Sequence, residues 1–492
     1  MFRVPERVRA AVAGRFGARR VLVVGDLMLD RYLTGAVGRI SPEAPVPVLR
    51  LGGERVVAGG AANVARNLIG LGLSVAVAGV CGADADGSAL TALLDAAGMD
   101  RAAVLVDLGR PTTSKTRVVA SGQQMLRIDS EDTAALSAPL ADALVQAVLA
   151  RLPDAQVLLL SDYAKGVLSA DVCARLIDAA ASRGLPVLVD PKGRDFSRYR
   201  GATLLTPNRA ELALATGADA TDLDGLLAQG EVLRAALGLR QVVVTLGELG
   251  MALLDGDHPQ PTRVPAVARE VFDVSGAGDT VIASIAAGLA AGLDPIDTAH
   301  LANLAAGVVV GHRGTAAITA AELAAAIAGE AALEQAAKVR GLADMRAQVE
   351  AWRAAGERVV FTNGCFDLLH VGHVTYLERA RRHGQRLVVG LNTDRSVRAL
   401  KGPERPLIGE QDRARVLAAL AAVDGVVLFD EDTPIELIRA LRPDVLAKGA
   451  DYREDEVVGA AEVKGWGGQV VLVPLVADRS TSAIVARMHP DG

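Results

Sequence analysis

Cysteine is scarce in this sequence: Cys81, Cys173 and Cys365 are three in 492 residues and lie far apart. Without a CxxC pair, the chain has neither a disulfide framework nor a cysteine zinc site, and it suits a reducing compartment. Long apolar runs are missing too. The uncharged run 281–293 falls short of the ~20 residues that span a bilayer, and the charged N-terminal residues lack the apolar core of a secretory signal. We therefore expect a cytoplasmic protein without a membrane span.

Aromatic residues make up only 3% of the chain, while hydrophobic residues make up 51%. The apolar side chains are therefore small and aliphatic, which is typical of helices packed on parallel strands and predicts an α/β fold. A length of 492 residues favours two domains. The formal net charge of -6 gives no electrostatic footprint for nucleic acid, so we expect no such partner.

Two common nucleotide motifs are also missing. No GxxxxGK[ST] occurs, and GAGDTV lacks the third glycine of a dinucleotide fingerprint, which argues against a P-loop NTPase and an ordinary Rossmann dehydrogenase. The same stretch, 271–280, instead combines a glycine turn, a helix start and a carboxylate. The first N–H groups of the predicted helix lie at 276–279, where the helix dipole favours an anion.

Asp279 lies in the first turn of that helix. Since Ser275 can cap the helix, Asp279 is free to accept a proton from an attacking hydroxyl, and the stretch predicts a phosphoryl-transfer site. The same residues also fit an ordinary glycine turn, in which Asp279 only complements the helix dipole.

Polar residues follow the apolar runs that we expect to be buried strands. Asp26 and Asp30 follow such a run, and ligands in open α/β sheets bind beyond the carboxyl ends of strands. We therefore predict that both carboxylates accept hydrogen bonds from sugar hydroxyls, with a strand-to-loop cap as the alternative. The pair Gly59-Gly60 lets a ligand approach the backbone and leads into a helix that carries Asn63.

Several cations are expected near this sugar site. PTTSKTRVVASGQQMLRIDSED alternates like paired strands and brings Lys115, Arg117 and Arg127 together. Lys165 and Lys192 follow later apolar runs that should end at the same mouth. Such cations can hold a phosphate already present on the substrate. The alternative is a solvated strand face.

Asp26, the GG…N segment, the NxxE of PNRAE, TLG and GAGD occur in the order of the ribokinase (PfkB) sugar kinases, over about 21–319. This resemblance implies that Asp279 is the catalytic base and that the GAG amides form the anion hole. Val274 and Ser275 depart mildly from the DTxGAGD signature of these kinases. Mg²⁺ is implied, with Glu211 acting on it through water. The implied ATP site consists of Asn208, Arg209, Ala210, Glu211, Thr245, Gly247, Gly276, Ala277, Gly278 and Asn303.

The segment 320–356 reads as short, charged, alanine-rich helices without strand signals. We predict a kinase domain at 1–330, a linker at 331–341 and a second domain at 342–492.

The second domain opens with a strand, a glycine turn and a helix start that bears His370 and His373. The pair could be half of a metal site, but no third ligand is obvious nearby. HxGH with an upstream GxFD resembles the cytidylyltransferase-like nucleotidyltransferases, in which the histidines stabilise charge on the α-phosphate and on pyrophosphate. RSTSAI stands where that family has an ISSTxI-type motif. The implied nucleotide site consists of Thr362, Asn363, Gly364, Phe366, Asp367, Asn392, Asp394, Lys401, Lys448, Arg479, Ser480, Thr481 and Ser482.

SDYAKGVL, QQMLRID and LAKGADY resemble the bifunctional enzymes that join a heptose 7-phosphate kinase to a heptose 1-phosphate adenylyltransferase. The resemblance implies a ribokinase-like α/β domain with a small β lid, followed by a Rossmann-like HxGH domain. It implies ATP-dependent phosphorylation of D-glycero-β-D-manno-heptose 7-phosphate at C1, then adenylyl transfer giving ADP-heptose for lipopolysaccharide. Sugar kinases of this type often pair through their lid strands, so a homodimer is an expectation.

Two alternatives remain. One is a ribokinase-type kinase for another sugar, fused to a different nucleotidyltransferase. The other is a ligand-sensing regulator on a retired kinase fold, which the intact Asp279 and both histidines disfavour.

Overall fold

The chain is described by a computed structural model that covers residues 2–120, 122–267, 273–274, 276–312 and 316–474. It divides into two compact units, Met1–Ile327 and Ala328–Gly492. Helix α10 (Ala320–Ala336) runs through the junction. No helix among these residues has the length and apolarity to cross a membrane.

The first unit is built on a mainly parallel sheet. In the described residues its order is β13-β12-β11-β10-β9-β8-β1-β4-β5, with β12 and β13 antiparallel at one edge. The strands are β1 (Arg20–Gly25), β4 (Ser74–Gly82), β5 (Asp100–Asp107), β8 (Val157–Ser161), β9 (Val187–Asp190), β10 (Leu204–Leu205), β11 (Gln241–Thr245), β12 (Met251–Asp255) and β13 (His258–Val264).

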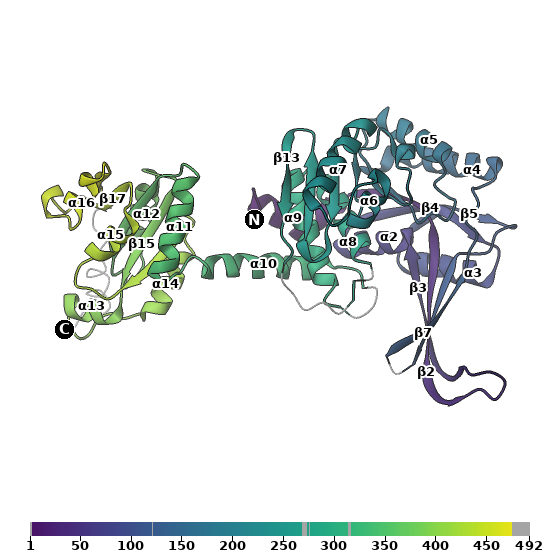
Figure 1. The fold of residues 1–492 in the computed structure, drawn as a ribbon, viewed down its shortest axis with the longest axis horizontal. Coiled ribbons are helices and arrows are strands. Elements are labelled where there is room, and N and C mark those ends of the chain that lie inside the picture. The colour runs from purple at the N-terminus through teal and green to yellow at the C-terminus, as the bar shows by residue number, and fades with distance from the viewer. Residues whose placement is uncertain (1, 121, 268–272, 275, 313–315, 475–492) are drawn as a thin grey trace. The chain divides into compact units, whose positions relative to one another are not determined.

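Both faces of this sheet are covered by helices, so successive residues of a strand enter different cores. Val21 and Val23 of β1 pack in one cluster, and Leu22 and Val24 pack in the other. Figure 1 shows α4 and α5 on one side of the sheet and α2 and α3 on the other. The first cluster involves α1 (Pro5–Ala13), α2 (Ala61–Leu71), α3 (Ala85–Ala96), α8 (Ala277–Ala290) and α9 (Pro295–Val309). The second involves α4 (Ala138–Leu149), α5 (Ala170–Ala181), α6 (Arg209–Thr216) and α7 (Leu223–Leu237).

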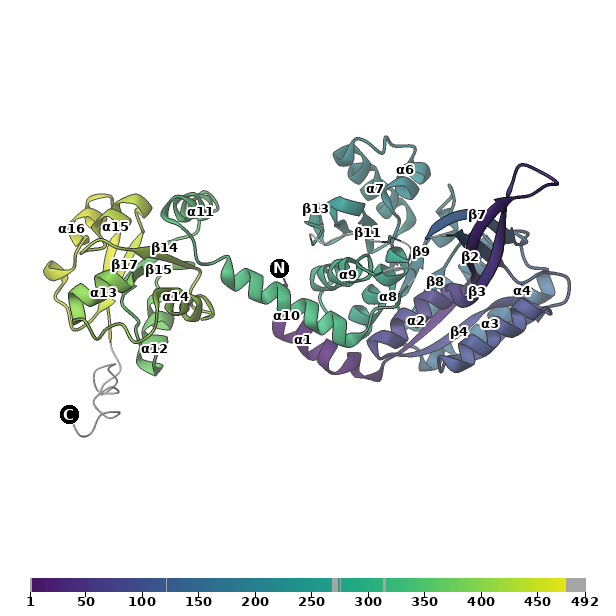
Figure 2. The ribbon, with the colours of Figure 1, turned by 90° about the horizontal axis from the view of Figure 1, so that it is seen from below.

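A separate four-stranded sheet forms a lid on this unit, in the order β3-β2-β6-β7. β2 and β3 run side by side away from the main sheet in both ribbon views (Figures 1 and 2). Asp26 lies between β1 and β2, so the chain passes from the main sheet into the lid at a predicted site residue. The lid strands are β2 (Leu27–Ile40), β3 (Pro47–Gly60), β6 (Ser114–Ala120) and β7 (Gln123–Ser130).

The second unit has a parallel sheet in the order β16-β15-β14-β17-β18. The strand order reverses between β14 and β17, which is the switch point where open α/β sheets bind ligands. The strands are β14 (Val359–Gly364), β15 (Arg386–Asn392), β16 (Gly425–Phe429), β17 (Val445–Gly449) and β18 (Gln469–Val473). The helices are α11 (Leu342–Ala354), α12 (Val371–Arg381), α13 (Asp394–Lys401), α14 (Glu410–Ala418), α15 (Ile435–Leu441) and α16 (Ala460–Gly465).

Part of the predicted linker pairs with the edge of this second sheet. The Val426 N–H donates to Lys338 O at 2.8 Å, and the Arg340 N–H donates to Val426 O at 3.0 Å. The segment 338–340 therefore lies along β16. The limits of the linker, 331–341, stay a prediction.

Candidate active sites

Helix α8 begins directly after the glycine turn of the GAGD stretch. Gly276 precedes the helix with φ +84°, a left-handed conformation that glycine adopts without strain. Asp279 lies in the first turn, where N–H groups and the helix dipole favour an anion. A Cβ added at Gly278 would meet no atom within 4 Å, so that backbone borders open space. The predicted helix start is confirmed, while Ser275 lies outside the described residues.

The Asp279 carboxylate is buried and bonded through both oxygens. Asn63 Nδ2 donates to Oδ2 at 2.6 Å, and the Tyr163 hydroxyl donates to Oδ1 at 2.5 Å. Burial raises the pKa of Asp279, while these two hydrogen bonds oppose the rise. One turn after Asn63, Asn67 accepts from the Thr280 hydroxyl at 3.0 Å and so joins α2 to the start of α8.

A cavity of about 190 Å³ adjoins Asp279. It brings the GAGD turn together with the end of β11 and the start of α6, which are far apart in sequence. Its lining contains Tyr163, Asp190, Lys192, Thr206, Asn208, Glu211, Thr245, Gly276, Gly278 and Asp279. Five of the predicted ATP residues are in this set. The predicted ATP residues outside it are Arg209, Ala210, Gly247, Ala277 and Asn303.

The NxxE motif forms a capping box at the start of α6. Asn208 Oδ1 accepts the Glu211 N–H at 2.9 Å, and Glu211 Oε2 accepts the Asn208 N–H at 2.9 Å. The other oxygen, Oε1, lies 2.5 Å from Lys192 Nζ. Burial would lower the pKa of Lys192, but the bond to Glu211 raises it, so the lysine is a cation here. Lys192, predicted in the sugar site, therefore lies with the predicted ATP residues.

Asp26 is bonded to the backbone of the loop that follows β8. Its buried carboxylate accepts the backbone N–H groups of Tyr163 at 2.8 Å, Lys165 at 3.0 Å and Val167 at 3.2 Å. Burial raises the pKa of Asp26, and these bonds oppose the rise. The carboxylate thus orients the loop after β8, while its predicted contact with a sugar stays a prediction.

Asp30 contacts the lid and the glycine pair. It forms an ion pair with Arg117 of β6. A Cβ added at Gly59 would lie 2.1 Å from Asp30 Oδ2. Gly60 has φ +58°, and a Cβ there would lie 2.4 Å from Asp26 O, so a side chain is excluded most strongly at Gly60. Asp30 also lies near Lys115, which is half-buried.

The remaining predicted cations of the sugar site, Lys115, Lys165 and Arg127, differ in burial and in their partners. Burial and the neighbouring Lys165 lower the pKa of Lys115, so those two ammonium groups lie near each other. Lys165 is also paired with Glu131 at 2.8 Å. Arg127 lies on the exposed β7 and pairs with Asp129 at 2.9 Å. The charge of Arg127 also lowers the pKa of Lys115, so both Lys165 and Arg127 act electrostatically on Lys115, although Arg127 lies on an exposed strand.

Sequence reasoning missed three residues of this site: Tyr163, Asp190 and Thr206. All three come at or just after the end of a buried strand, which is the available signal. Burial and the nearby carboxylates of Asp279 and Glu211 raise the pKa of Asp190 well above its usual range.

In the second unit, the HxGH stretch begins α12. His370 is the N-cap, and its Nδ1 accepts the Gly372 N–H at 3.1 Å. The rings of His370 and His373 stack with centroids 3.9 Å apart, and Phe366 lies edge-on to His373 at 5.2 Å. Burial, then His370 and Lys401, lower the pKa of His373 to about 4. Both imidazoles lie at the positive end of a helix, where phosphate oxygens bind favourably.

The end of β14 lies beside the end of β17 at the switch point. Lys448 Nζ donates to Asn363 Oδ1 at 2.9 Å, and burial lowers the pKa of Lys448. Thr362 is buried, and its hydroxyl lies 2.7 Å from the hydroxyl of Tyr376. Phe366 has φ +44°, so the turn before the histidines is strained.

Three predicted residues of this unit are engaged by neighbouring groups. The buried Asp367 pairs with Arg405 and accepts the Leu407 N–H. Asp394 pairs with the buried Arg413 at 2.7 Å. Asn392 Nδ2 donates to the Ser396 hydroxyl at 3.0 Å. These contacts order the loops around the site. Sequence reasoning missed Arg413, which pairs with Asp394, and Tyr376, which contacts Thr362.

The remaining predicted nucleotide-site residues lie at the ends of elements or outside the described residues. Gly364 ends β14, and Lys401 ends α13. Arg479, Ser480, Thr481 and Ser482 lie outside the described residues. Within the described ranges, no group of three or more His, Cys, Asp or Glu side chains could hold a metal ion.

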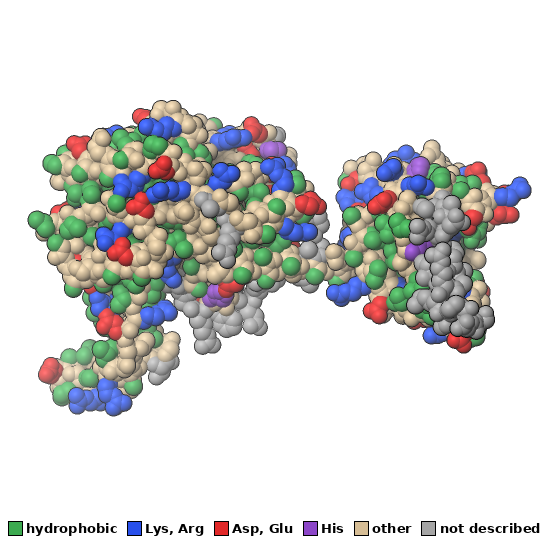
Figure 3. All heavy atoms as spheres, turned by 180° about the vertical axis from the view of Figure 1, so that it is seen from behind, with side chains coloured by type: hydrophobic (Ala, Val, Ile, Leu, Met, Phe, Trp, Pro, Cys, Tyr) green, Lys and Arg blue, Asp and Glu red, His purple; other side chains and the backbone are tan. Residues whose placement is uncertain are grey.

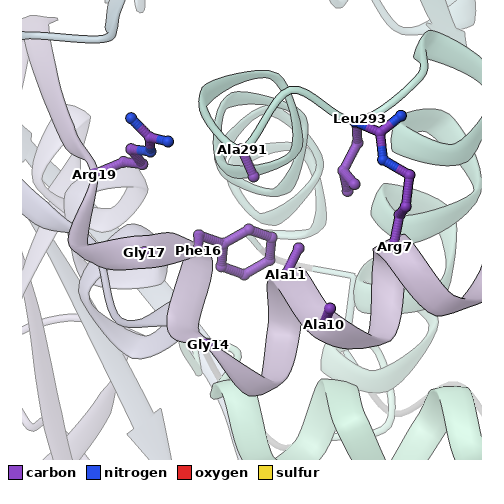
Figure 4. Close-up of a pocket in the computed structure, with 9 residues that line it drawn as sticks. All are labelled: Arg7, Ala10, Ala11, Gly14, Phe16, Gly17, Arg19, Ala291 and Leu293. Atoms are coloured by element: carbon purple, nitrogen blue, oxygen red, sulfur yellow. The ribbon is translucent and has the colours of Figure 1, made fainter.

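A separate hollow lies between α1 and the end of α8 (Figure 4). Arg7 and Arg19 stand on opposite sides of it, with the Phe16 ring between them. Asp279 is in the first turn of α8, so the length of this 14-residue helix, about 20 Å, separates the hollow from the kinase site.

Comparison with known proteins adds two family matches. The pfkB family carbohydrate kinase model matches residues 18–322, and the cytidylyltransferase-like model matches residues 361–487. Among solved structures, a ribokinase from Arabidopsis thaliana complexed with ribose and ATP is 22% identical, with TM-score 0.51, over 63% of this chain and 99% of that chain. Phosphofructokinase-2 from Escherichia coli in complex with potassium is 22% identical, with TM-score 0.54, over 63% of this chain and 98% of that chain. At these identities the likeness shows the fold alone, and it confirms the predicted fold of the first unit.

Three relatives named bifunctional protein HldE match nearly the whole length. The protein from Magnetococcus marinus is 59% identical over 97% of this chain and 99% of its own. The one from Methylobacillus flagellatus is 57% identical, over 95% and 96%. The one from Caulobacter vibrioides is 50% identical, over 96% and 98%.

Proposed function

The chain belongs to the family of bifunctional HldE proteins, in which a pfkB-type carbohydrate kinase precedes a cytidylyltransferase-like domain, and we propose which of its residues carry out each of the two reactions. It is an enzyme that phosphorylates heptose 7-phosphate at the C1 hydroxyl with ATP. The product of that step is a 1,7-bisphosphate. After separate hydrolysis of its 7-phosphate, the second unit transfers an adenylyl group from ATP to heptose 1-phosphate, giving ADP-heptose and pyrophosphate. The product supplies lipopolysaccharide synthesis.

In the kinase site, Asp279 takes the proton of the C1 hydroxyl. The observation that carries this assignment is a buried carboxylate in the first turn of α8, on a cavity that also contains Lys192 and Glu211. The amides of the GAG turn receive the transferred phosphoryl group. Lys192 neutralises charge on the ATP phosphates. Positioning and electrostatics thus perform most of the catalysis.

Magnesium accompanies ATP in both reactions. In the kinase site, both oxygens of Glu211 already accept bonds, from Lys192 and from the Asn208 N–H, so Glu211 would hold the ion only through water. The ion would neutralise the β- and γ-phosphates. Removing the ion should stop both reactions.

The sugar phosphate lies on the lid side of Asp279. Lys115 and Lys165 converge there, and Arg117 is held by Asp30 of the neighbouring strand. A dianionic phosphate bound by these cations would direct the far hydroxyl towards Asp279.

In the second site, His370 and His373 bind the triphosphate at the start of α12, and Lys448 on the end of β17 donates to Asn363 at the end of β14. The attacking sugar phosphate is already an anion, so no protein base is required. An uncharged His373 donates a hydrogen bond to developing charge without repelling Lys401, whose charge lowers the pKa of His373. Arg479 to Ser482 complete this site as a prediction from the motif alone.

The lid is also the proposed dimer contact. Figure 3 shows hydrophobic side chains on the projecting arm. The exposed apolar side chains of the lid include Val37, Ile40, Val46, Leu51, Leu126 and Ile128. Burying this surface against a second copy would remove apolar area from water. Sedimentation of wild type and of Leu126→Asp tests this, because the substitution should shift a dimer towards monomer. A monomeric wild type would refute the contact.

We place both reactions in the cytoplasm, where ATP is available.

The test of the whole assignment is stepwise. The protein is incubated with ATP and magnesium in two separate assays: ADP formation is measured with heptose 7-phosphate, and pyrophosphate formation is measured with heptose 1-phosphate. Asp279→Asn should stop ADP formation, whereas His373→Ala should stop pyrophosphate formation only. Phosphorylation of ribose or fructose 6-phosphate in preference to heptose 7-phosphate would instead favour a kinase for another sugar.

A further inference from the structure

Tyr163 directly contacts the group that we assign as the kinase base. Its hydroxyl donates to Asp279 Oδ1 at 2.5 Å, while Asn63 Nδ2 donates to Oδ2 at 2.6 Å. Each oxygen of the buried carboxylate therefore has a neutral donor, and the plane of the carboxylate is fixed between the loop after β8 and helix α2. A hydrogen bond to a buried carboxylate favours its ionised form.

The loop that presents Tyr163 is anchored independently of the phenol. Asp26 accepts the N–H groups of Tyr163, Lys165 and Val167. Gly166 has φ +90°, and a Cβ there would lie 1.9 Å from Ala134 O. Ala164 also has positive φ, +57°. The backbone path is thus set by Asp26 and tight packing, so removal of the Tyr163 hydroxyl should leave the loop in place.

We propose that Tyr163 is a positioning residue of the kinase reaction, which holds the Asp279 carboxylate ionised and aligned and gives up Oδ1 to the acceptor hydroxyl when the sugar phosphate binds. The inference rests on the proposed role of Asp279. In the reaction, the O–H bond of the acceptor breaks and its proton passes to Asp279. The oxygen electron pair forms the new bond to the γ-phosphorus of ATP, and the bond to the bridging oxygen breaks to release ADP.

Tyr163 keeps its own proton throughout. Burial, and then the Asp279 charge, raise the pKa of the phenol well above its usual range. It therefore acts as a donor only, and cannot replace Asp279 as the base.

Other charged groups around Asp279 also shift its pKa, some upwards and some downwards. Asp30 from β2 raises the pKa of Asp279, and Lys115 from β6 lowers it. Asp190 from β9 lies close enough for its own pKa to be raised by Asp279. Lys192 and Glu211 line the same cavity as a pair. Because these charges remain in a Tyr163→Phe variant, the change isolates one hydrogen bond.

The experiment compares pH profiles of the kinase reaction for wild type and Tyr163→Phe, from pH 5 to pH 9, with heptose 7-phosphate and saturating ATP. Loss of the donor should move the acid limb of kcat/KM upwards by about one pH unit or more, because a hydrogen bond to a charged group is lost. At pH values below the acid limb, kcat/KM of Tyr163→Phe should therefore be about tenfold lower than that of wild type. The acid limb of the kcat profile should move less. It reports the substrate complex, in which the acceptor hydroxyl, and not Tyr163, is bonded to Asp279 Oδ1.

Tyr199→Phe is the matched control. Its hydroxyl donates to Asp162 Oδ2 at 2.6 Å, a buried phenol-carboxylate bond of the same kind that does not touch Asp279. The acid limb should stay at the wild-type pH in this variant. Pyrophosphate formation from ATP and heptose 1-phosphate by the same preparations measures the integrity of the second unit.

Two failures are distinguishable. If Asp279→Asn retains the wild-type rate, the proposed base is wrong. If Asp279→Asn is inactive but Tyr163→Phe has the wild-type acid limb, the inference about Tyr163 is overturned, even if the rate falls equally at every pH.

Discussion

Lys192 and Glu211 form an ion pair, with Nζ 2.5 Å from Oε1, in the cavity that also contains Asp279. The other oxygen of Glu211 caps α6 by accepting the Asn208 N–H at 2.9 Å. A substrate phosphate that enters this cavity would therefore meet a cation whose position is set by the start of a helix.

Lys192→Ala should mainly raise KM for ATP, by about tenfold, because one contact to an ion is lost. The comparison variant is Lys115→Ala on the lid, which should mainly raise KM for heptose 7-phosphate. Steady-state kinetics with each substrate varied in turn measures both effects. An equal rise in KM for heptose 7-phosphate in the two variants would mean that Lys192 binds the sugar phosphate and not ATP.

Asp279→Asn should lower the kinase rate by ~10² to 10⁴, because the shape is kept and the general base is lost. ADP formation from ATP and heptose 7-phosphate measures the rate. Pyrophosphate formation from heptose 1-phosphate should be unchanged, since it takes place in the other unit. A variant with more than a tenth of the wild-type kinase rate would contradict the assignment.

His370→Ala and His373→Ala should each remove most pyrophosphate release, since loss of one donor to developing charge costs ~3 kcal/mol or more. Sugar phosphorylation is the internal control and should persist. Inhibition by a zinc-selective chelator in the presence of excess magnesium would point to a metal site at the histidines instead.

The low pKa of His373 predicts acid sensitivity of the second unit. The folded pKa is about 4, against an ordinary value of 6.5. Between these values the unfolded chain binds more protons, so stability rises with pH across this window and falls on acidification from pH 6.5 to pH 4. The Tm of a C-terminal fragment should fall more steeply over that window in wild type than in His373→Gln. Parallel curves for the two proteins would refute this.

The two units should fold as separate fragments, because each has its own sheet and core. A second fragment that begins at Ala328 keeps the hydrogen bonds from 338–340 to Val426, whereas one that begins at Leu342 loses them. Each lost bond is worth ~0.5 to 1.5 kcal/mol, so the longer fragment should have the higher Tm in thermal unfolding. Insolubility of both halves would mean that the units depend on each other to fold.

Features that depend on near neighbours in the chain were predictable from the sequence. Gly276 and Asp279 are three residues apart, and a positive-φ glycine before an apolar helix specifies both the turn and the carboxylate in the first turn. His370 at the start of α12 follows from the same local logic. Buried parallel strands were readable because both of their faces are apolar.

The partners of the polar side chains were decided only by the tertiary structure. Tyr163 and Asp279 are separated by 116 residues, and Asp26 and Tyr163 by 137, so no local pattern could indicate that they meet. Lys192 follows a strand end, as do the other predicted cations, yet the packing of β9 beside β10 brings it to Glu211 and away from the lid. The sequence by itself determined which residues stand at the mouths of the sheets. Folding decided which oxygen each of them bonds, because that choice depends on the order of strands and on the burial of each charge.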